Sequence, residues 1–459
     1  MRHDMNELLT DAAARAMQYL EGIGRRRVAP APEDVARLEP LGGPLPPHPT
    51  DPAEVIALLD QAGSPATVAS AGGRYFGFVT GGSLPAALAA NWLAGAWDQN
   101  AALRVMSPVA AAIEEIAIEW IRDLLGLPRG CGAGFVTGAT MANFTCLAAA
   151  RHALLSRAGW DVEENGLFEA PPIRVVVSDE VHVSLLKALA MLGLGRSRVS
   201  RVAADEQGRM KAEAVPPLDD RTIVCIQAGN VNTGAFDPAE EICARARKAA
   251  SWVHVDGAFG LWAAASPVYT HLAAGIAAAD SWTVDCHKWL NVPYDSGLAL
   301  VREPEQLRAA MAFGAAYLPA AETREPAHYV PESSRRARGI EVWAALRSLG
   351  REGLAAMIER TGRLAARFAD GLRNAGYSVL NEVVLNQVLV SFGEDELTRR
   401  IIADIQNDGV CWCSGTEWRG RAAMRISVSS WKTTEDDVDK SAAAIVRIAS
   451  GLKRAAVPR

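Results

Sequence analysis

The sequence predicts an α/β protein with a mostly parallel central sheet and a smaller C-terminal α+β domain. From about Pro108 onward, short apolar runs alternate with longer segments of helical periodicity, which is typical of successive β-α-β units. With 459 residues, of which 49% are hydrophobic, the chain is long enough to bury more than one core. Beyond residue 340 a long helical segment precedes further strands and helices, which indicates the second domain.

The expected elements follow in chain order. An amphipathic helix should run to about Glu21 and a second from about Pro52 to Gln61, separated by the proline-rich connector EPLGGPLPPHPTDP. A helix opened by Pro238 is expected in PAEEICARARKAA, and the segment 320–339 should be a long loop. Further strands are expected in IRVVVSD, RTIVCIQAG, SWVHVDG, SGLALVR and AAMRISVSS, and further helices in HVSLLKALAMLG, IEVWAALRSLGREGLAAMIERTGRLAARFADGLRNAG and TTEDDVDKSAAAIVRIASGLKR.

We expect three segments in the domain organisation. Residues 1–65 should form an N-terminal helical extension, residues 66–315 a large domain, and residues 316–459 a mobile loop followed by the small domain.

Composition argues against several classes of partner. A net charge of −6 and a pI near 5.9 provide no field that would attract a nucleic acid. No run of eighteen uncharged apolar residues is present, and the N-terminal segment mixes charged with apolar residues, so neither a membrane span nor a signal peptide is expected. Seven scattered cysteines suit a reducing, cytoplasmic compartment, and Cys411 with Cys413 alone does not make a metal site.

Lys288 is the first candidate for chemistry. It lies in ADSWTVDCHKWLN, close to Trp282, Trp289 and Leu290, in a segment that otherwise favours burial. Burial lowers the pKa of a lysine, and a desolvated amine attacks carbonyl carbons, so this lysine is suited to a Schiff base. A lysine at a strand end that extends its ammonium into water is the alternative interpretation.

Asp256 is the second candidate. It ends an almost wholly apolar strand and precedes a sharp turn, at the edge where open α/β sheets bind ligands. A carboxylate there can keep a pyridine nitrogen protonated, and a protonated pyridine ring is a good electron sink. An aspartate that only caps the turn is the alternative.

A phosphate turn and two histidines complete the set of candidates. FVTGATMANFTCLAAAR combines a strand, a turn of small residues and a helix, which places backbone N–H groups and the Thr140 hydroxyl where a phosphate could bind. It lacks the patterns of nucleotide-binding loops. His182 opens a helix directly after a strand, where its imidazole could stack on an aromatic cofactor or satisfy turn carbonyls, and the same two interpretations apply to His287. In this order along one domain, the features together indicate pyridoxal phosphate.

The stretch from about Ser107 to Arg302 resembles the group II pyridoxal-phosphate decarboxylases, which include aromatic amino acid, glutamate and cysteine sulfinate decarboxylases. HVDGAFG and HKWLN are the specific motifs, and SP…EE…GLP, VTGATMAN…AAR, SDEVHVSLLKA and NTGAFDP support them. A weaker resemblance continues through SRRARGIEVWAALRSLGREG and RISVSSWKTTEDDV. The resemblance implies the fold of aspartate aminotransferase (fold type I), used as a homodimer with active sites at the subunit boundary.

The resemblance also implies roles for individual residues. Lys288 would form the Schiff base with the cofactor, Asp256 would pair with the pyridine nitrogen, and His182 would stack on the ring. Tyr329 lies about three residues from the position of the family's proton-donating tyrosine and would share catalysis with Lys288 and His182. The remaining cofactor contacts would come from Gly138, Ala139, Thr140, Asn230, Ala258 and His287, and the substrate contacts from Phe78, Thr80 and Arg425.

Three positions depart from the family pattern. Asn230 stands where a threonine usually supports the ring oxygen, and it can still donate a hydrogen bond. Asp285 stands where the aromatic decarboxylases have an asparagine near the phosphate, so its carboxylate must point away from the phosphate or be paired. Gly77 occupies a place that is aromatic in the aromatic decarboxylases, which weakens the case for an aromatic substrate.

The predicted function is decarboxylation of an L-amino acid to the corresponding amine and CO₂. An aminotransferase or another lyase on the same fold is the main alternative, because Arg425 resembles the arginine with which aminotransferases hold the substrate's α-carboxylate. Arg425 can also be interpreted as a strand-edge arginine that pairs with a helix or an acidic neighbour. A non-catalytic protein that binds the cofactor or a partner is a further alternative. Acidic, aliphatic and aromatic substrates all remain open.

Overall fold

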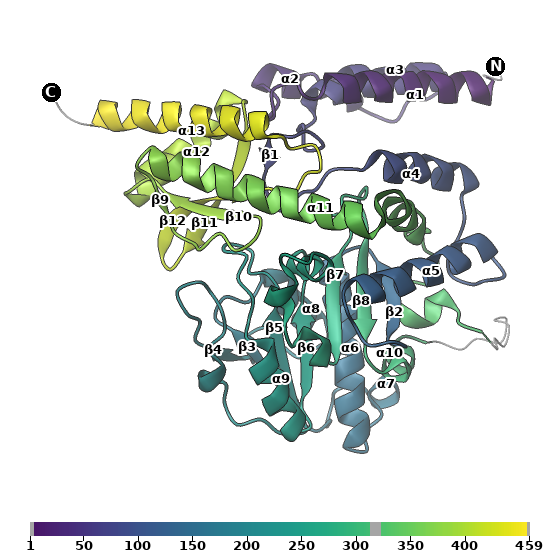
Figure 1. Ribbon diagram of the computed structural model, residues 1–459. Helices are drawn as coiled ribbons and strands as arrows, with labels where there is room; N and C mark the ends of the chain where they lie inside the picture. The colour runs from purple at the N-terminus through teal and green to yellow at the C-terminus, as the bar shows by residue number, and fades with distance from the viewer. Residues whose placement is uncertain (1–3, 313–322, 457–459) are drawn as a thin grey trace. The chain divides into compact units, whose positions relative to one another are not determined.

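The computed structural model describes residues 4–312 and 323–456 (Figure 1). The chain forms two compact units, a larger one from Gly81–Ala365 and Asn381–Gln387 and a smaller one from Met1–Thr80, Ala366–Leu380 and Val388–Arg459. Each of these units contains segments that are far apart in the sequence. The domain boundaries expected after residues 65 and 315 stay a prediction. Among the described residues, no helix has the length and apolar character needed to cross a membrane.

In the described part of the larger unit, seven strands form one sheet in the order β2-β8-β7-β6-β5-β3-β4. The five strands β7, β6, β5, β3 and β4 pair with one another in parallel. Strand β8 runs antiparallel to both of its neighbours, β2 and β7. The mostly parallel sheet is therefore confirmed, and its apolar strands are buried, as expected for such a sheet. The strands are β2 (Gly132–Val136), β3 (Arg174–Ser178), β4 (Ser200–Val202), β5 (Thr222–Gln227), β6 (Trp252–Asp256), β7 (Ser281–Asp285) and β8 (Gly297–Val301).

Helices α6, α8 and α10 pack together against this sheet. Their apolar residues, such as Leu147, Leu189 and Leu307, share one buried cluster with residues of the strands. The predicted helices after β3 and β5 are confirmed, with His182 and Pro238 as the residues immediately before them. The helices of this unit are α4 (Pro85–Trp97), α5 (Pro108–Leu124), α6 (Ala139–Arg157), α7 (Val162–Asn165), α8 (Val183–Met191), α9 (Ala239–Lys248) and α10 (Pro304–Met311), and its short 3₁₀ helices are η2 (Ala212–Ala214), η3 (Gly260–Ala265), η4 (Thr270–Ala273), η5 (Ile276–Ala278) and η6 (Pro326–Tyr329).

The smaller unit has its own sheet, in the order β1-β11-β12-β10-β9. Its first strand, β1, comes from early in the chain and pairs in parallel with β11 near the C-terminus, a pairing that the sequence did not suggest. Both predicted N-terminal helices and the acidic C-terminal helix are confirmed. The elements are α1 (Met5–Gly22), α2 (Pro32–Ala36), η1 (Glu39–Leu41), α3 (Pro52–Ala66), β1 (Tyr75–Phe76), β9 (Ser378–Val379), β10 (Gln387–Ser391), α12 (Asp395–Asp408), β11 (Trp412–Trp418), β12 (Arg421–Ser427) and α13 (Glu435–Ala456). A long helix, α11 (Gly339–Asn374), contributes residues to both units and is interrupted at Gly350, where φ is 61°.

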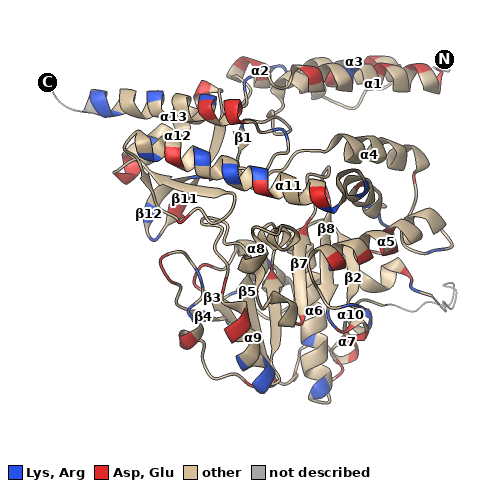
Figure 2. Ribbon diagram, viewed as in Figure 1, with Lys and Arg blue, Asp and Glu red and all other residues tan. Residues whose placement is uncertain are grey.

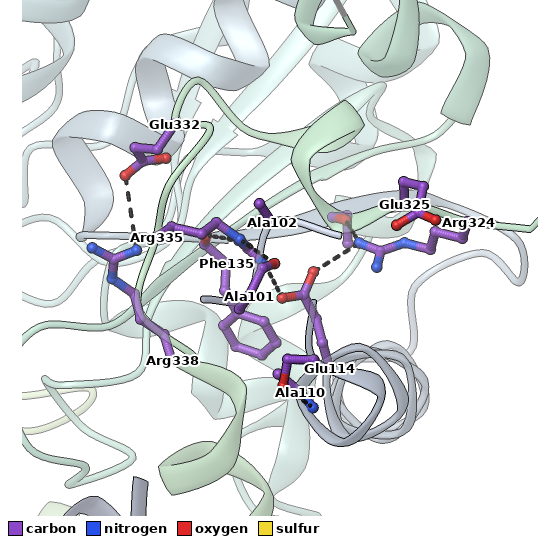
Figure 3. A network of polar contacts seen from close by, with 12 residues as sticks. Ala101, Ala102, Ala110, Glu114, Phe135, Arg324, Glu325, Glu332, Arg335 and Arg338 are labelled. Atoms are coloured by element: carbon purple, nitrogen blue, oxygen red, sulfur yellow. Dashed lines mark hydrogen bonds and ion pairs between the residues drawn. The ribbon is translucent and has the colours of Figure 1, made fainter. Parts of the chain in front are cut away.

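A buried ionic network fixes the segment that precedes α11 (Figure 3). The Glu114 carboxylate on α5 is 2% exposed and pairs with Arg324 at 3.0 Å and with Arg335. The Arg335 guanidinium also donates hydrogen bonds to the carbonyl oxygens of Ala101 (3.0 Å) and Phe135 (2.8 Å). Because a buried charge is tolerated only when it is paired and hydrogen-bonded, these contacts fasten the segment to α5 and β2.

The loop expected at 320–339 is therefore only partly a loop. From Thr323 onward the chain contains η6 and the arginines of this network, so this part is held in place by the larger unit. Residues 320–322 lie outside the described residues.

Replacing Glu114 by alanine is expected to destabilise the larger unit strongly. The change would leave two arginines without their common anion, and removal of one partner of a buried pair costs about 3–5 kcal/mol. Urea unfolding followed by tryptophan fluorescence measures the loss. Glu119→Ala on the same helix is the matched control, because its side chain is 66% exposed and such a pair contributes about 1 kcal/mol or less. Equal midpoints for the two variants would contradict this interpretation.

Candidate active site

Lys288 lies three residues beyond the end of β7, where it forms an ion pair with the last residue of that strand. Its Nζ atom is 2.7 Å from Oδ2 of Asp285, and the side chains of Asp285 and Lys288 are 1% and 20% exposed. Burial, the largest effect, lowers the pKa of Lys288, but the charge of Asp285, with smaller contributions from Asp256 and Tyr294, raises this pKa above its ordinary value of 10.5. The expected lowered pKa is therefore wrong, because the ammonium is buried together with a carboxylate.

Asp285 also connects the lysine to the start of α6. Its Oδ1 atom accepts a hydrogen bond of 2.6 Å from the backbone N–H of Ala139, in the first turn of that helix. A carboxylate at a helix N-terminus interacts favourably with the partial positive charge there. Of the two alternatives expected for Asp285, a side chain that points away from the phosphate or one that is paired, the structure shows the paired one. This side chain links the end of β7, Lys288 and the predicted phosphate turn.

Asp256 ends β6, beside β7 in the parallel part of the sheet, as the sequence predicted. It is 5% exposed. Its Oδ2 accepts a hydrogen bond from Nδ2 of Asn143 at 3.1 Å, and its Oδ1 accepts one from the N–H of Ala258 at 3.2 Å. The carbonyl oxygen of Ala258 accepts a hydrogen bond from the N–H of Asp285 at 2.9 Å. Asp256 and Asp285 therefore end adjacent strands at one edge of the sheet.

The turn before α6 is closely packed around Gly138. A Cβ atom at this position would lie 2.9 Å from Cε1 of His287, so only glycine fits without a shift. Nδ1 of His287 accepts a hydrogen bond of 3.1 Å from the N–H of Ser296. Burial, the largest effect, lowers the pKa of His287 against the influence of Asp285, so the neutral ring carries its proton on Nε2. Because the first N–H groups of a helix lack partners within it, those of Thr140 and Met141 are suited to a phosphate.

His182 and Asn230 both stabilise their own turns. Nδ1 of His182 accepts a hydrogen bond of 3.2 Å from the N–H of Ser184, and so caps α8. Oδ1 of Asn230 accepts hydrogen bonds from the N–H groups of Asn232 (2.9 Å) and Thr233 (3.3 Å), which leaves its amide Nδ2 as the donor that the resemblance requires. The roles of both residues toward a cofactor stay predictions.

Tyr329 lies on η6, where it packs against the core cluster of the larger unit. The guanidinium of Arg324 lies over its ring, 4.6 Å from the ring centroid. Arg324 is in turn paired with Glu114, so the same buried network positions Tyr329. Its role as a proton donor stays a prediction.

The predicted substrate residues Phe78, Thr80 and Arg425 belong to the smaller unit, and their contacts with a substrate stay predictions. Arg425 is 8% exposed and lies on β12, between β11 and β10, so the interpretation as a strand-edge arginine is wrong. Burial lowers the pKa of Arg425 to about 10, which leaves it protonated at neutral pH.

Gly77 is explained by its neighbours in the same unit. A Cβ atom there would overlap the indole of Trp412, which stacks on Tyr75 with ring centroids 5.1 Å apart. The ring of Phe78, which is 61% exposed, lies 5.4 Å from the same indole. The glycine therefore makes room for Trp412, and what position 77 implies for the substrate stays a prediction.

Comparisons with known proteins identify the class. The model of the pyridoxal-dependent decarboxylase conserved domain matches residues 68–393. An aromatic-L-amino-acid decarboxylase of Bacillus atrophaeus is 27% identical over 85% of this chain and 84% of its own. An L-2,4-diaminobutyrate decarboxylase of Rhizobium meliloti (strain 1021) is 29% identical over 80% of this chain and 76% of its own. The crystal structure of Oryza sativa TDC with PLP and tryptamine superposes with a TM-score of 0.89 at 23% identity, covering 98% of both chains.

The fold is thus that of the fold type I pyridoxal-phosphate enzymes. The chain belongs to the pyridoxal-dependent decarboxylase family, whose members are pyridoxal-phosphate-dependent amino acid carboxy-lyases. The residues described above fit this cofactor. They offer an amine at Lys288, a carboxylate at Asp256, and a closely packed glycine turn at the start of a helix, beside an Asp285 charge that is already paired.

Asp285→Asn is expected to lower the pKa of Lys288, because the opposing charge is lost while the burial remains. An adjacent opposite charge shifts a pKa by about 1–3 units, and only the neutral amine attacks an aldehyde. The visible absorbance of bound pyridoxal phosphate should therefore develop about tenfold faster or more at neutral pH. Asp280→Asn, at the opposite end of β7, is the control and should leave the pH dependence of this rate unchanged. If the rate of absorbance development varies with pH in Asp285→Asn as it does in the unmodified protein, Asp285 does not raise the pKa of Lys288.

Proposed function

We propose that this protein converts an L-amino acid to the corresponding amine and CO₂, with Lys288 as the lysine that binds the aldehyde of pyridoxal phosphate. The observation that carries the proposal is that an amine and a carboxylate lie at the ends of two adjacent strands, β7 and β6. Lys288 is held by Asp285 at the end of β7, and Asp256 stands at the end of the neighbouring strand β6. An amine and a carboxylate at one sheet edge are the two groups that this cofactor needs from a protein.

Pyridoxal phosphate, when bound, supplies a ring that accepts the electron pair left on the α-carbon after a bond to it breaks. Asp256 would keep the ring nitrogen protonated. The α-carbon then needs a proton, and the raised pKa of Lys288 makes it an acid that is protonated at neutral pH. Tyr329, with the Arg324 cation over its ring, is the second candidate for this acid.

Transamination is the competing reaction, and Arg425 is the observation that favours it. This arginine is buried and stays positively charged, as a group that holds a substrate carboxylate must. A carboxylate held in that way would not be the one lost. The relatives named for aromatic amino acids and for L-2,4-diaminobutyrate match about equally well, so they do not select a side chain for the substrate.

A panel of amino acids tests the proposal. Aromatic, acidic, aliphatic and diamino substrates are each mixed with the protein and pyridoxal phosphate, and CO₂ and the matching amine are measured. Lys288→Ala should lower turnover by roughly a thousandfold or more, because the same residue binds the cofactor and supplies a proton. The exposed Lys187→Ala is the control and should retain full activity. A keto acid product that forms only when a 2-oxo acid is added would show transamination instead.

We further propose that the protein is a homodimer. Helix α4 contains no Lys, Arg, Asp or Glu, so its ribbon is tan in Figure 2. Its Trp92, Leu93 and Trp97 are 45%, 54% and 44% exposed. Val105 and Met106, which lie shortly after α4 in the sequence, are 72% and 49% exposed. A monomeric protein rarely exposes so many large apolar side chains within one short stretch, so we expect a second copy of the chain to bury them.

Sedimentation of a charged variant tests the dimer. Trp92→Glu would place a carboxylate in the apolar contact, where it would be desolvated without a partner, so the dimer should dissociate at micromolar concentration. Phe168→Ser is the matched control, because Phe168 is 91% exposed but lies on a different segment. A monomeric unmodified protein, or a Trp92→Glu variant that sediments as the unmodified dimer does, contradicts the proposed surface.

A further inference from the structure

A line of buried polar side chains leads away from Asp256 into the larger unit. Asn143 on α6 donates to Asp256, and the Oδ1 of Asn143 lies 2.8 Å from Nε2 of His254. Nδ1 of His254 lies 2.9 Å from Oγ of Ser281, and Nε1 of Trp252 donates to the same Oγ at 2.9 Å. Each of the five side chains is 5% exposed or less.

The regular geometry of β6 produces this line. Side chains at alternate positions of a strand point to the same face, so Trp252, His254 and Asp256 share one face of β6. Ser281 begins the parallel neighbour β7 and pairs in register with His254. Polar side chains on neighbouring strands and α6 are therefore placed within hydrogen-bonding distance in a region that is otherwise apolar.

The Asp256 carboxylate fixes the direction of the hydrogen bonds. It can only accept, so Nδ2 of Asn143 donates to it and Oδ1 of Asn143 is left as an acceptor. Nε2 of His254 must therefore carry the proton that it donates to Oδ1 of Asn143, and Nδ1 of the neutral ring accepts from the Ser281 hydroxyl. The same hydroxyl accepts from the indole of Trp252, which can only donate, so this arrangement gives every donor in the line an acceptor.

His254 connects Ser281 to Asn143 through its two ring nitrogens, and its ring is uncharged. Burial, the largest effect, lowers the pKa of His254 to about 4 against the smaller opposing influence of Asp256. The imidazole is therefore neutral at physiological pH, so the line places no cation next to Asp256. Hydrogen bonds donated to a carboxylate favour its ionised form.

We propose that Asn143 and His254 are positioning residues that hold Asp256 ionised and in a fixed orientation toward the ring nitrogen of pyridoxal phosphate. This inference rests on the proposed function. Oδ2 is held by Asn143 and Oδ1 by the N–H of Ala258, so the plane of the carboxylate is set before any cofactor binds. Ser281, which accepts a hydrogen bond from Trp252, acts one step further back by donating to Nδ1 of His254.

The experiment compares two probes, pyridoxal phosphate and a deaza analogue in which a C–H group replaces the ring nitrogen. Both apparent dissociation constants are measured by quenching of tryptophan fluorescence. Asn143→Leu removes the last donor of the line, and it should weaken pyridoxal phosphate binding by about tenfold while leaving the analogue unaffected, because the analogue has no ring nitrogen for Asp256 to pair with. Ser281→Ala removes the hydroxyl that donates to His254 and should give a smaller loss of the same selectivity.

Thr145→Val is the matched control. Thr145 lies on the same helix as Asn143 and is fully buried, but its hydroxyl donates to the carbonyl oxygen of Met141 instead of joining the line. This variant should bind both probes as the unmodified protein does. If Asn143→Leu does not fold, Ser281→Ala alone decides the outcome.

The outcomes separate the two proposals. Equal weakening of both probes by Asn143→Leu and Ser281→Ala, or no effect on either probe, would overturn the positioning role while the proposed function stands. An unmodified protein that binds neither probe would overturn the proposed function itself, and this inference with it.

Discussion

The Asp285 carboxylate makes the contact on which the rest of the site depends. One of its oxygens pairs with the Lys288 ammonium and the other accepts the N–H of Ala139, so a single buried side chain joins the end of β7 to the start of α6. A buried carboxylate costs several kcal/mol of desolvation unless it is paired and hydrogen-bonded, and here both conditions are met. The ion pair in turn raises the pKa of Lys288, which burial alone would lower.

Two buried aspartates at adjacent strand ends thus have different surroundings. Asp285 faces a cation, whereas the hydrogen bonds to the Asp256 carboxylate within the described part of the chain come from neutral donors, Asn143 and the backbone of Ala258. The first carboxylate is paired with Lys288, and the second is held by hydrogen bonds from an amide side chain and a backbone N–H. This division suits a cofactor that needs an amine at one point and a negative charge at another.

Much of the larger unit could be predicted because its signals are local. Apolar runs of strand length gave β3, β5, β6 and β8, and the placement of Asp256 at a strand end followed from the turn after it. The pKa of Lys288 could not be predicted, since its direction depends on how close Asp285 lies in space. The positions of Asn143 and His254 were also missed, although a histidine two residues before Asp256 in an apolar strand was a signal that could have been used.

Other misses came from partners that lie far away in the sequence. A side chain at position 77 would overlap the indole of Trp412, and β1 pairs with β11. Neither contact follows from a local pattern in the sequence. The loop expected near Ala320 to Gly339 is fixed from Thr323 onward because its arginines reach Glu114 on α5.

Peptide mapping after borohydride reduction tests the central claim most directly. The purified protein is mixed with pyridoxal phosphate, reduced, digested and analysed by mass spectrometry. We predict a visible chromophore that disappears on reduction and a reduced pyridoxyl group on the peptide that carries Lys288. A protein that stays colourless, or a label confined to other lysines, would contradict the account.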